Sequence, residues 1–386
     1  MHKLKIVADE KIPFLDKLFY RIGEIKTLPS SEIKKENIKD FDILMVRTVT
    51  KVDAQLLENT RVKIVCTMAS GIDHIDRIYL KKNNIRFIYA PGSNARAVAE
   101  YVIVSLLLLA KIKNISLNNK TVGVIGVGNV GKKVARFCSA LGMNVLLNDP
   151  PKFNRFKNIK YLSLKNLSDA DIITLHVPLT FSGKYKTYHM ADENFFSSLK
   201  NGTIFINTSR GSVVDERALL TYHKKLLGIV LDVWENEPSI NIELLKITDI
   251  GTPHIAGYSI DGKFNASFIV YKKLCKLLGI KPSINKSEVF PRTIIEKDIS
   301  IRNDIFQTLY EIILQIYNPL NDHNELIKIT KIGTSARREY FEMLRKNYPF
   351  RREFTNYLLR VNTLDSHFKK YEEIFKSLGF KIKNRG

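Results

Sequence analysis

The sequence predicts an α/β protein built on parallel sheets, with a nucleotide-binding unit inserted into a second α/β unit. Short apolar runs alternate with helical patterns over residues 4–90 and again over 121–252, and a glycine-rich turn begins only at Gly126. Strands separated by helices are typical of parallel sheets. The 386 residues, 45% of them apolar, leave room for two or three domains with well-buried cores.

The first run of elements begins with a strand at 4–7 and a helix at 13–22. Short buried strands are expected at three further places: 43–46, 63–66 and 86–89. The stretch Ala90-Pro-Gly-Ser-Asn94 then breaks the pattern, and a long helix is expected over about 95–111. This helix leads to the glycine turn.

The glycine turn follows an apolar strand at 121–125 and precedes a helical pattern at 132–141. Its residues are Gly126, Val127, Gly128, Asn129, Val130 and Gly131. A strand, a GxGxxG turn and a helix in one βαβ unit form a dinucleotide fingerprint. The turn brings backbone N–H groups to a pyrophosphate, whose negative charge the helix N-terminus favours.

An acidic residue, Asp149, ends the next apolar run at 145–147. A carboxylate there accepts hydrogen bonds from the adenosine ribose hydroxyls and repels a 2′-phosphate, so NAD is favoured over NADP. Lys152 and Arg155 follow closely, and their positive charges would attract a 2′-phosphate and so favour NADP.

Three further buried strands, at 171–176, 203–207 and 228–232, carry polar residues at or beyond their ends. Ligands of open α/β sheets bind beyond the carboxyl ends of the strands. Arg210, Glu237 and His254 are the charged or titratable residues that stand out in the segments after the fingerprint. Each alone is weak evidence, since a single histidine is more often structural and a strand-end arginine often forms a surface ion pair.

Together the three residues suit the oxidation of a hydroxy acid. A histidine removes the hydroxyl proton as a hydride leaves carbon, because its pKa lies near the operating pH. A carboxylate on its other ring nitrogen fixes the tautomer and stabilises the imidazolium, which is the expected role of Glu237 beside His254. An arginine holds a substrate carboxylate through two parallel hydrogen bonds, the expected role of Arg210.

Residues 1–285, with the glycine turn, the Arg210, Glu237–Pro238 and Pro253–His254 segments in order, resemble the D-2-hydroxyacid dehydrogenase family. The resemblance implies a Rossmann-type NAD domain inserted into a flavodoxin-like substrate domain, with the active site in the cleft between them. It implies an Arg, Glu, His catalytic set: Arg210, Glu237 and His254. The expected domains are 1–95 with 256–284 for substrate, 96–255 for NAD, and a small C-terminal α+β domain at 285–386.

The resemblance also implies individual contacts. Val177, Asp232 and Gly257 are expected to contact the cofactor. Thr48, Ala69 and Tyr258 occupy substrate-contacting positions of the family. Ala69 lacks a hydroxyl usual there, for which the neighbouring Ser70 is a candidate substitute, and Arg96 stands where an apolar residue is usual. Arg47 is a candidate for a substrate phosphate, because a dianion needs a cation or several N–H donors; a surface salt bridge is the alternative.

The tail at 285–386 reads as helical around 304–317 and is rich in Lys and Arg. It resembles the C-terminal dimerisation domain of a branch of the family that oxidises a small phosphorylated hydroxy acid, so a homodimer is expected. Another D-2-hydroxyacid dehydrogenase, such as one acting on phosphoglycerate, is the alternative. The tail lacks the βαββαβ alternation of the regulatory domain that some phosphoglycerate enzymes carry.

The formal net charge of +22 raises the possibility of nucleic-acid binding, as in an NAD-sensing, dehydrogenase-like corepressor. The lysines are scattered through every segment, which favours a solvated surface and no nucleic-acid partner. Three distant cysteines suggest neither a metal site nor disulfides. The longest apolar window, 101–110, is too short for a bilayer, and the chain opens directly into a strand, so a cytoplasmic enzyme is expected.

Overall fold

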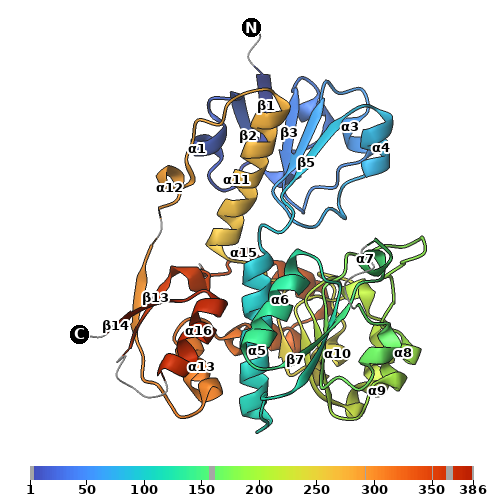
Figure 1. The fold of residues 1–386 in the computed structure, drawn as a ribbon. Helices are drawn as coiled ribbons and strands as arrows, with labels where there is room; N and C mark the ends of the chain where they lie inside the picture. Colours follow the sequence, from blue (N-terminus) through green and yellow to red (C-terminus); the bar gives the residue numbers. More distant parts are fainter. Residues whose placement is uncertain (1–3, 156–160, 292, 350, 362–367, 385–386) are drawn as a thin grey trace. The chain divides into compact units, whose positions relative to one another are not determined.

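The computed structural model describes residues 4–155, 161–291, 293–349, 351–361 and 368–384. The chain divides into two compact units, one formed by residues 1–94 and 259–293 and the other by 95–258 and 294–386 (Figure 1). All strand pairs of the three described sheets are parallel. The predicted α/β class with parallel sheets is confirmed.

The first unit holds a five-stranded sheet in the order β2-β1-β3-β4-β5. This is the flavodoxin-like order, which reverses direction between β1 and β3. The strands are β1 (Leu4–Asp9), β2 (Gly23–Leu28), β3 (Ile43–Val46), β4 (Ile64–Thr67) and β5 (Arg86–Tyr89). Strand β2 was not predicted, because this edge strand buries only its two end residues and lacks the apolar run of a central strand.

Helices cover both faces of this sheet (Figure 1). Alternate strand residues face opposite sides, so Ile6 and Ala8 join the core under α1, α11 and α12 while Val7 joins the core under α2, α3 and α4. The predicted helix at 13–22 is shorter in the structure. The helices are α1 (Leu15–Phe19), α2 (Lys35–Ile38), α3 (Ala54–Leu57), α4 (Arg77–Lys82), α11 (Ile260–Leu277) and α12 (Lys286–Val289).

The second unit holds a six-stranded sheet in the order β11-β10-β9-β8-β6-β7, with its reversal at β6. The strands are β6 (Thr121–Ile125), β7 (Asn144–Asn148), β8 (Ile172–Leu175), β9 (Thr203–Asn207), β10 (Leu226–Leu231) and β11 (Ile250–Gly251). Helices α5 (Ala95–Ile112) and α6 (Asn129–Ala140) cover one face, and α8 (Glu193–Ser198), α9 (Glu216–Tyr222) and α10 (Ile242–Ile247) cover the other (Figure 1). The short helix α7 (Pro150–Arg155) follows β7.

The C-terminal segment belongs to the second unit and carries its own three-stranded sheet. Its apolar side chains join the cores on both faces of the six-stranded sheet. Its elements are β12 (Ile295–Asp298), α13 (Ile305–Leu314), α14 (Pro319–Leu326), α15 (Thr334–Lys346), β13 (Tyr357–Val361), α16 (Phe368–Leu378) and β14 (Lys381–Asn384).

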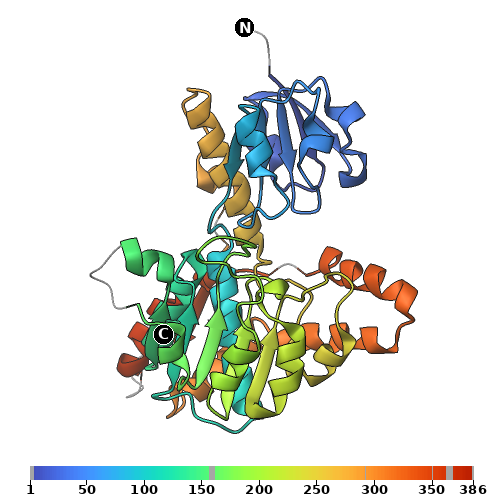
Figure 2. The ribbon, with the colours of Figure 1, turned by 90° about the vertical axis from the view of Figure 1, so that its right-hand side faces the viewer.

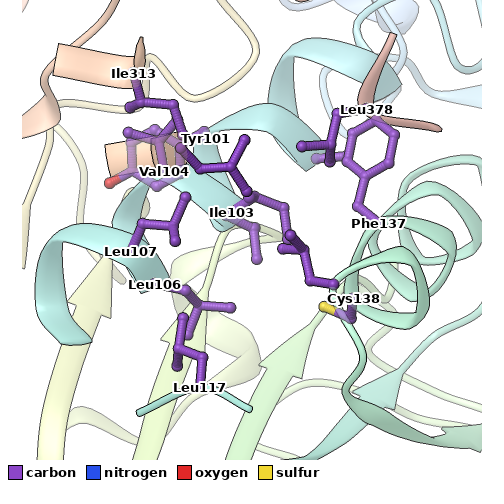
Figure 3. Packing of buried hydrophobic residues seen from close by; sticks show 14 of the residues in the cluster. Tyr101, Ile103, Val104, Leu106, Leu107, Leu117, Phe137, Cys138, Ile313 and Leu378 are labelled. Atoms are coloured by element: carbon purple, nitrogen blue, oxygen red, sulfur yellow. The ribbon is translucent and has the colours of Figure 1, made fainter. Parts of the chain in front are cut away.

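Helix α5 is buried along almost its whole length, because the C-terminal segment covers the side that the sheet leaves open. Ile313 of α13 and Leu378 of α16 lie in the same cluster as Tyr101 and Leu107 of α5 (Figure 3). Each such large side chain contributes on the order of 2 kcal/mol when it is fully removed from water.

Arg96 of α5 forms a hydrogen bond with the end of α16. Its Nη1 donates to the Leu378 carbonyl at 3.0 Å, and its guanidinium lies over the Phe137 ring. The same Nη1 lies 3.6 Å from the buried Glu100 carboxylate. The cation therefore lies where α5, α16 and a buried carboxylate meet.

Helix α14 lies against β11 at the edge of the six-stranded sheet (Figure 2). His323 Nδ1 accepts a hydrogen bond from the Gly251 N–H at 3.0 Å. An edge strand otherwise presents unpaired backbone groups. The C-terminal segment thus satisfies a backbone donor three residues before His254.

Candidate active site

The glycine turn lies at the point where the order of the six-stranded sheet reverses, between the ends of β6 and β8. Gly126 has φ +86°, and a Cβ there would lie 2.7 Å from the His176 carbonyl carbon. A Cβ at Gly131 would lie 2.0 Å from the Gly126 carbonyl oxygen. Gly128, by contrast, faces open space, with no heavy atom within 4 Å of a built Cβ.

Helix α6 begins at Asn129, directly after this open position, so the N–H groups of Asn129 and Val130 belong to its first turn. The first N–H groups of a helix have no partner within it and attract anions. The turn therefore fits a dinucleotide pyrophosphate.

Asp149 follows β7 and reaches back to the same turn. Its Oδ2 accepts the Val127 N–H at 2.9 Å, and its Oδ1 accepts the Lys152 N–H at 3.1 Å. The Lys152 ammonium lies 3.5 Å from Oδ2 and also hydrogen-bonds the Val127 carbonyl. The Asp149 carboxylate thus lies beside the turn. Lys152, the nearby cation expected to weaken the preference for NAD, is its ion-pair partner.

His254 and Glu237 form a hydrogen-bonded pair. His254 Nδ1 lies 2.7 Å from Glu237 Oε2, and Glu237 Oε1 accepts the Trp234 N–H at 2.8 Å. Burial raises the pKa of Glu237, but the facing His254, the Trp234 N–H and the charge of Arg345 outweigh it, so the pKa is lowered. An ionised Glu237 keeps the proton on Nδ1 and leaves Nε2 as the basic nitrogen.

Asp232, at the end of β10, shapes the loop that presents His254. Its Oδ1 accepts hydrogen bonds from the Thr252 hydroxyl at 2.6 Å, the Ile255 N–H at 2.7 Å and the Ala256 N–H at 3.0 Å. Within this loop His254 has φ +56°, a left-handed conformation that is uncommon for a residue with a side chain. Burial raises the pKa of Asp232 to about 6 despite these donors.

Arg210 follows β9 and lines the same hollow as Glu237 and His254. Asn207 Nδ2 donates to the Arg210 carbonyl at 2.9 Å, and Arg210 Nη1 donates to the Ser209 carbonyl at 2.7 Å. The structure therefore brings together the three residues that the sequence singled out, at the carboxyl ends of neighbouring strands.

In the first unit, Arg47 and Thr48 follow β3, and Ala69 and Ser70 follow β4. Arg47 Nε lies 3.0 Å from the buried Asp9 carboxylate, across the β1–β3 reversal, and Arg47 Nη2 donates to the Ser30 hydroxyl at 2.9 Å. These contacts agree with the alternative interpretation of Arg47, in which it forms a salt bridge within the protein.

Thr48 is exposed and Ala69 is buried. The Ser70 hydroxyl oxygen lies 3.1 Å from the Ala90 carbonyl and 2.9 Å from Asn94 Oδ1, so its single proton has an acceptor within its own unit. These bonds occupy the hydroxyl that was considered as a replacement for the one missing at Ala69.

The remaining predicted contacts lie around the same loops. Val177 follows β8, and its Cγ1 lies 2.8 Å from the position of a Cβ built on Gly126. Gly257 and Tyr258 continue the loop after His254, and both are partly exposed.

Two arginines of the C-terminal segment, for which the sequence predicted no contact with the site, contact this loop. Arg351 is 7% exposed, stacks on the Tyr317 ring and donates to the Ala256 carbonyl at 2.6 Å and the Tyr258 carbonyl at 3.2 Å. Arg345 Nη2 donates to the Tyr258 hydroxyl at 3.3 Å. Their sequence context carries no motif that indicates either contact.

Among the described residues, no group of three or more His, Cys, Asp or Glu side chains is placed to hold a metal ion. Nor does any described helix combine the length and apolar character needed to cross a membrane.

Comparison with known proteins assigns both parts of the second unit. Residues 108–256 match the family model "D-isomer specific 2-hydroxyacid dehydrogenase, NAD binding domain", and residues 291–378 match a "Domain of unknown function (DUF3410)". NAD as the cofactor, predicted from the glycine turn, is confirmed by this family match.

Curated relatives align along nearly the whole chain. An erythronate-4-phosphate dehydrogenase of Proteus mirabilis is 42% identical, covering 92% of this chain and 94% of that protein. One of Photorhabdus laumondii is 38% identical, covering 98% and 99%. Among solved structures, D-lactate dehydrogenase from Aquifex aeolicus, complexed with NAD and lactic acid, has a TM-score of 0.61 and 28% identity, covering 71% of this chain and 96% of that one.

Proposed function

Because the chain belongs to the erythronate-4-phosphate dehydrogenases, within the D-isomer specific 2-hydroxyacid dehydrogenase family, we propose that it oxidises 4-phospho-D-erythronate at C2. The product is 2-oxo-3-hydroxy-4-phosphobutanoate, and the step belongs to the biosynthesis of pyridoxal 5′-phosphate (vitamin B6). The pairing of His254 with Glu237 beside Arg210 is the observation that carries this proposal.

In the proposed mechanism His254 Nε2 takes the proton of the C2 hydroxyl. The carboxylate of Glu237, 2.7 Å from Nδ1, fixes the tautomer in which Nε2 is free and stabilises the imidazolium that forms. The Trp234 N–H holds the other oxygen of Glu237, so the carboxylate keeps its orientation as the charge on His254 changes.

Arg210 holds the substrate carboxylate, which is attached to C2. This contact orients the C2–H bond for hydride transfer, and the guanidinium polarises the oxygen on C2. Asn207, the last residue of β9, donates to the Arg210 carbonyl, and the Arg210 guanidinium donates to the Ser209 carbonyl, so the strand end fixes the position of the guanidinium.

NAD, when bound, supplies the acceptor for the hydride that leaves C2. The residues that would hold it are Gly126, Gly128, Asn129, Val130 and Gly131 at the pyrophosphate and Asp149 at the adenosine ribose. The open space at Gly128 supports this assignment. Val177, Asp232 and Gly257 are proposed for the nicotinamide side, where Asp232 acts through the loop that its carboxylate holds.

Thr48, Ala69 and Tyr258 are proposed substrate contacts, and Ala69 makes its contact without a hydroxyl group. Arg47 stays a candidate for the phosphate, although Asp9 and Ser30 already engage its guanidinium. We further propose that the enzyme is a cytoplasmic homodimer without a nucleic-acid partner.

The test is NADH formation by the purified protein with 4-phospho-D-erythronate and, in parallel, 3-phospho-D-glycerate. A second set of reactions contains an oxo-acid acceptor with product detection, so that turnover is seen even when the cofactor stays bound. A clear preference for the four-carbon substrate supports the proposal. Preference for 3-phospho-D-glycerate would keep the mechanism and refute the substrate.

A further inference from the structure

The C-terminal segment places a cation beside the acid–base pair. Arg345 lies in the last turn of α15, and its Nη2 donates to the hydroxyl of Tyr258, four residues after His254 in the same loop. Its charge is among those that lower the pKa of Glu237, the partner of His254. Residues 294–386 therefore contribute to the site as well as to the core.

The contacts of Arg345 leave donor capacity unused. Its side chain is 16% exposed, and its nearest carboxylate, Glu342 at 3.3 Å, is itself half exposed. Among the described residues the buried Nε atoms of Arg345 and Arg47 both lack a hydrogen-bond partner, but that of Arg47 lies 3.0 Å from the Asp9 carboxylate. A guanidinium carries five N–H donors, and a buried donor without a partner destabilises the free enzyme. Such a group is suited to an anion that arrives with the substrate.

We propose that Arg345 binds the phosphate group of the substrate and thereby selects a phosphorylated hydroxy acid. This inference rests on the proposed function and assigns to residues 294–386 a role in specificity.

The charges of the substrate favour the phosphate over the carboxylate as the partner of Arg345. A phosphate monoester carries nearly two negative charges at neutral pH, and the substrate carboxylate adds one. Arg210 serves the carboxylate at C1, so the phosphate at C4 needs another cation on the far side of C2. Arg345 lies on the Tyr258 side of the His254 loop, whereas Arg210 comes from the β9 turn.

Arg47 is the other candidate, but a buried carboxylate, that of Asp9, already lies 3.0 Å from its Nε and neutralises its charge. Arg345 has as its nearest carboxylate Glu342, on the neighbouring helical turn, whose side chain is 48% exposed. Water solvates the half-exposed Glu342 carboxylate once it leaves Arg345, so an incoming dianion displaces it at small cost.

The experiment compares wild type with Arg345→Met and Arg345→Lys, using 4-phospho-D-erythronate and the unphosphorylated D-erythronate as substrates. Arg338→Met is the matched control, because Arg338 is an exposed arginine of the same helix. Thermal unfolding and NAD affinity establish that each variant folds and binds cofactor as wild type does.

For Arg345→Met we expect kcat/KM with the phosphorylated substrate to fall about 100-fold, mainly through KM, the loss of a charge-assisted contact. The kcat/KM of the same variant with D-erythronate should change less than about threefold. Arg345→Lys should recover part of the preference, since it keeps the charge without the planar pair of donors. Inorganic phosphate should inhibit wild type and Arg338→Met competitively, and Arg345→Met much more weakly.

An equal loss with both substrates would assign Arg345 to tuning Glu237 and would overturn the inference alone. If Arg345→Met shows no loss and the ratio of kcat/KM for the phosphorylated and unphosphorylated substrates stays at the wild-type value, the inference is overturned as well. Failure of the wild type to oxidise 4-phospho-D-erythronate would refute the proposed function and the inference together, so the failures are distinguishable.

Discussion

Replacing Glu237 by glutamine is expected to lower kcat/KM by about 10²- to 10⁴-fold, because both carboxylate oxygens act as acceptors. Oε2 faces His254 Nδ1 at 2.7 Å and Oε1 accepts the Trp234 N–H at 2.8 Å. Glutamine has one acceptor oxygen and an NH2 group that only donates, so it can accept only one of these two hydrogen bonds.

Each orientation of the amide carries a penalty. When its nitrogen faces Trp234, two donors meet in a buried place at a cost of about 1–3 kcal/mol, which lowers the productive population by about 10- to 100-fold. When its nitrogen faces His254, the ring proton moves to Nε2 and the base is lost. In both orientations the imidazolium loses its counter-charge, which accounts for the remainder.

The assay is the initial rate of NADH formation with 4-phospho-D-erythronate between pH 6 and 9, with NAD affinity and thermal unfolding as folding controls. Glu235→Gln is the matched control, since Glu235 lies in the same loop and pairs with His189 at 2.6 Å. We expect that variant to retain activity within about threefold. A loss below threefold for Glu237→Gln, or an equal loss in both variants, would refute the reasoning.

Three further variants test other parts of the site. His254→Ala should retain NAD affinity and lose about 10²-fold or more in turnover, measured by the same rate assay; unchanged turnover would remove His254 from the mechanism. Asp149→Ser should relax the preference against NADP, because the variant lacks the carboxylate that would repel a 2′-phosphate; a constant ratio of kcat/KM for the two cofactors would place discrimination elsewhere. His323→Ala should lower stability at pH 7.5 more than at pH 5, measured by thermal unfolding. Burial lowers the pKa of His323 below 6.5, so the neutral ring that accepts the Gly251 N–H stabilises the fold above pH 6.5, and this contribution is lost as pH falls through the lowered pKa. Equal destabilisation at both pH values would contradict that account.

The sequence by itself was enough to predict the parallel α/β class and the NAD fingerprint, and to propose the set of Arg210, Glu237 and His254. These follow from properties that act over short stretches of chain. Apolar runs of strand length, turn glycines and the residues directly after a strand all carry their signal within one βαβ unit. The carboxyl ends of parallel strands meet at one edge, so the residues that follow them converge without further information.

Only the tertiary structure decided which distant residues meet. It shows that Arg47 pairs with Asp9 and that the Ser70 hydroxyl hydrogen-bonds within its own unit. It also shows that Asp232 accepts hydrogen bonds from the loop that carries His254. It also placed Arg345 beside Tyr258, the position from which we infer phosphate binding. Such contacts join residues separated by tens of positions, and they depend on how whole elements pack. A basic residue in a basic tail has the same local pattern whether it faces water or the active site, so packing alone distinguishes the two.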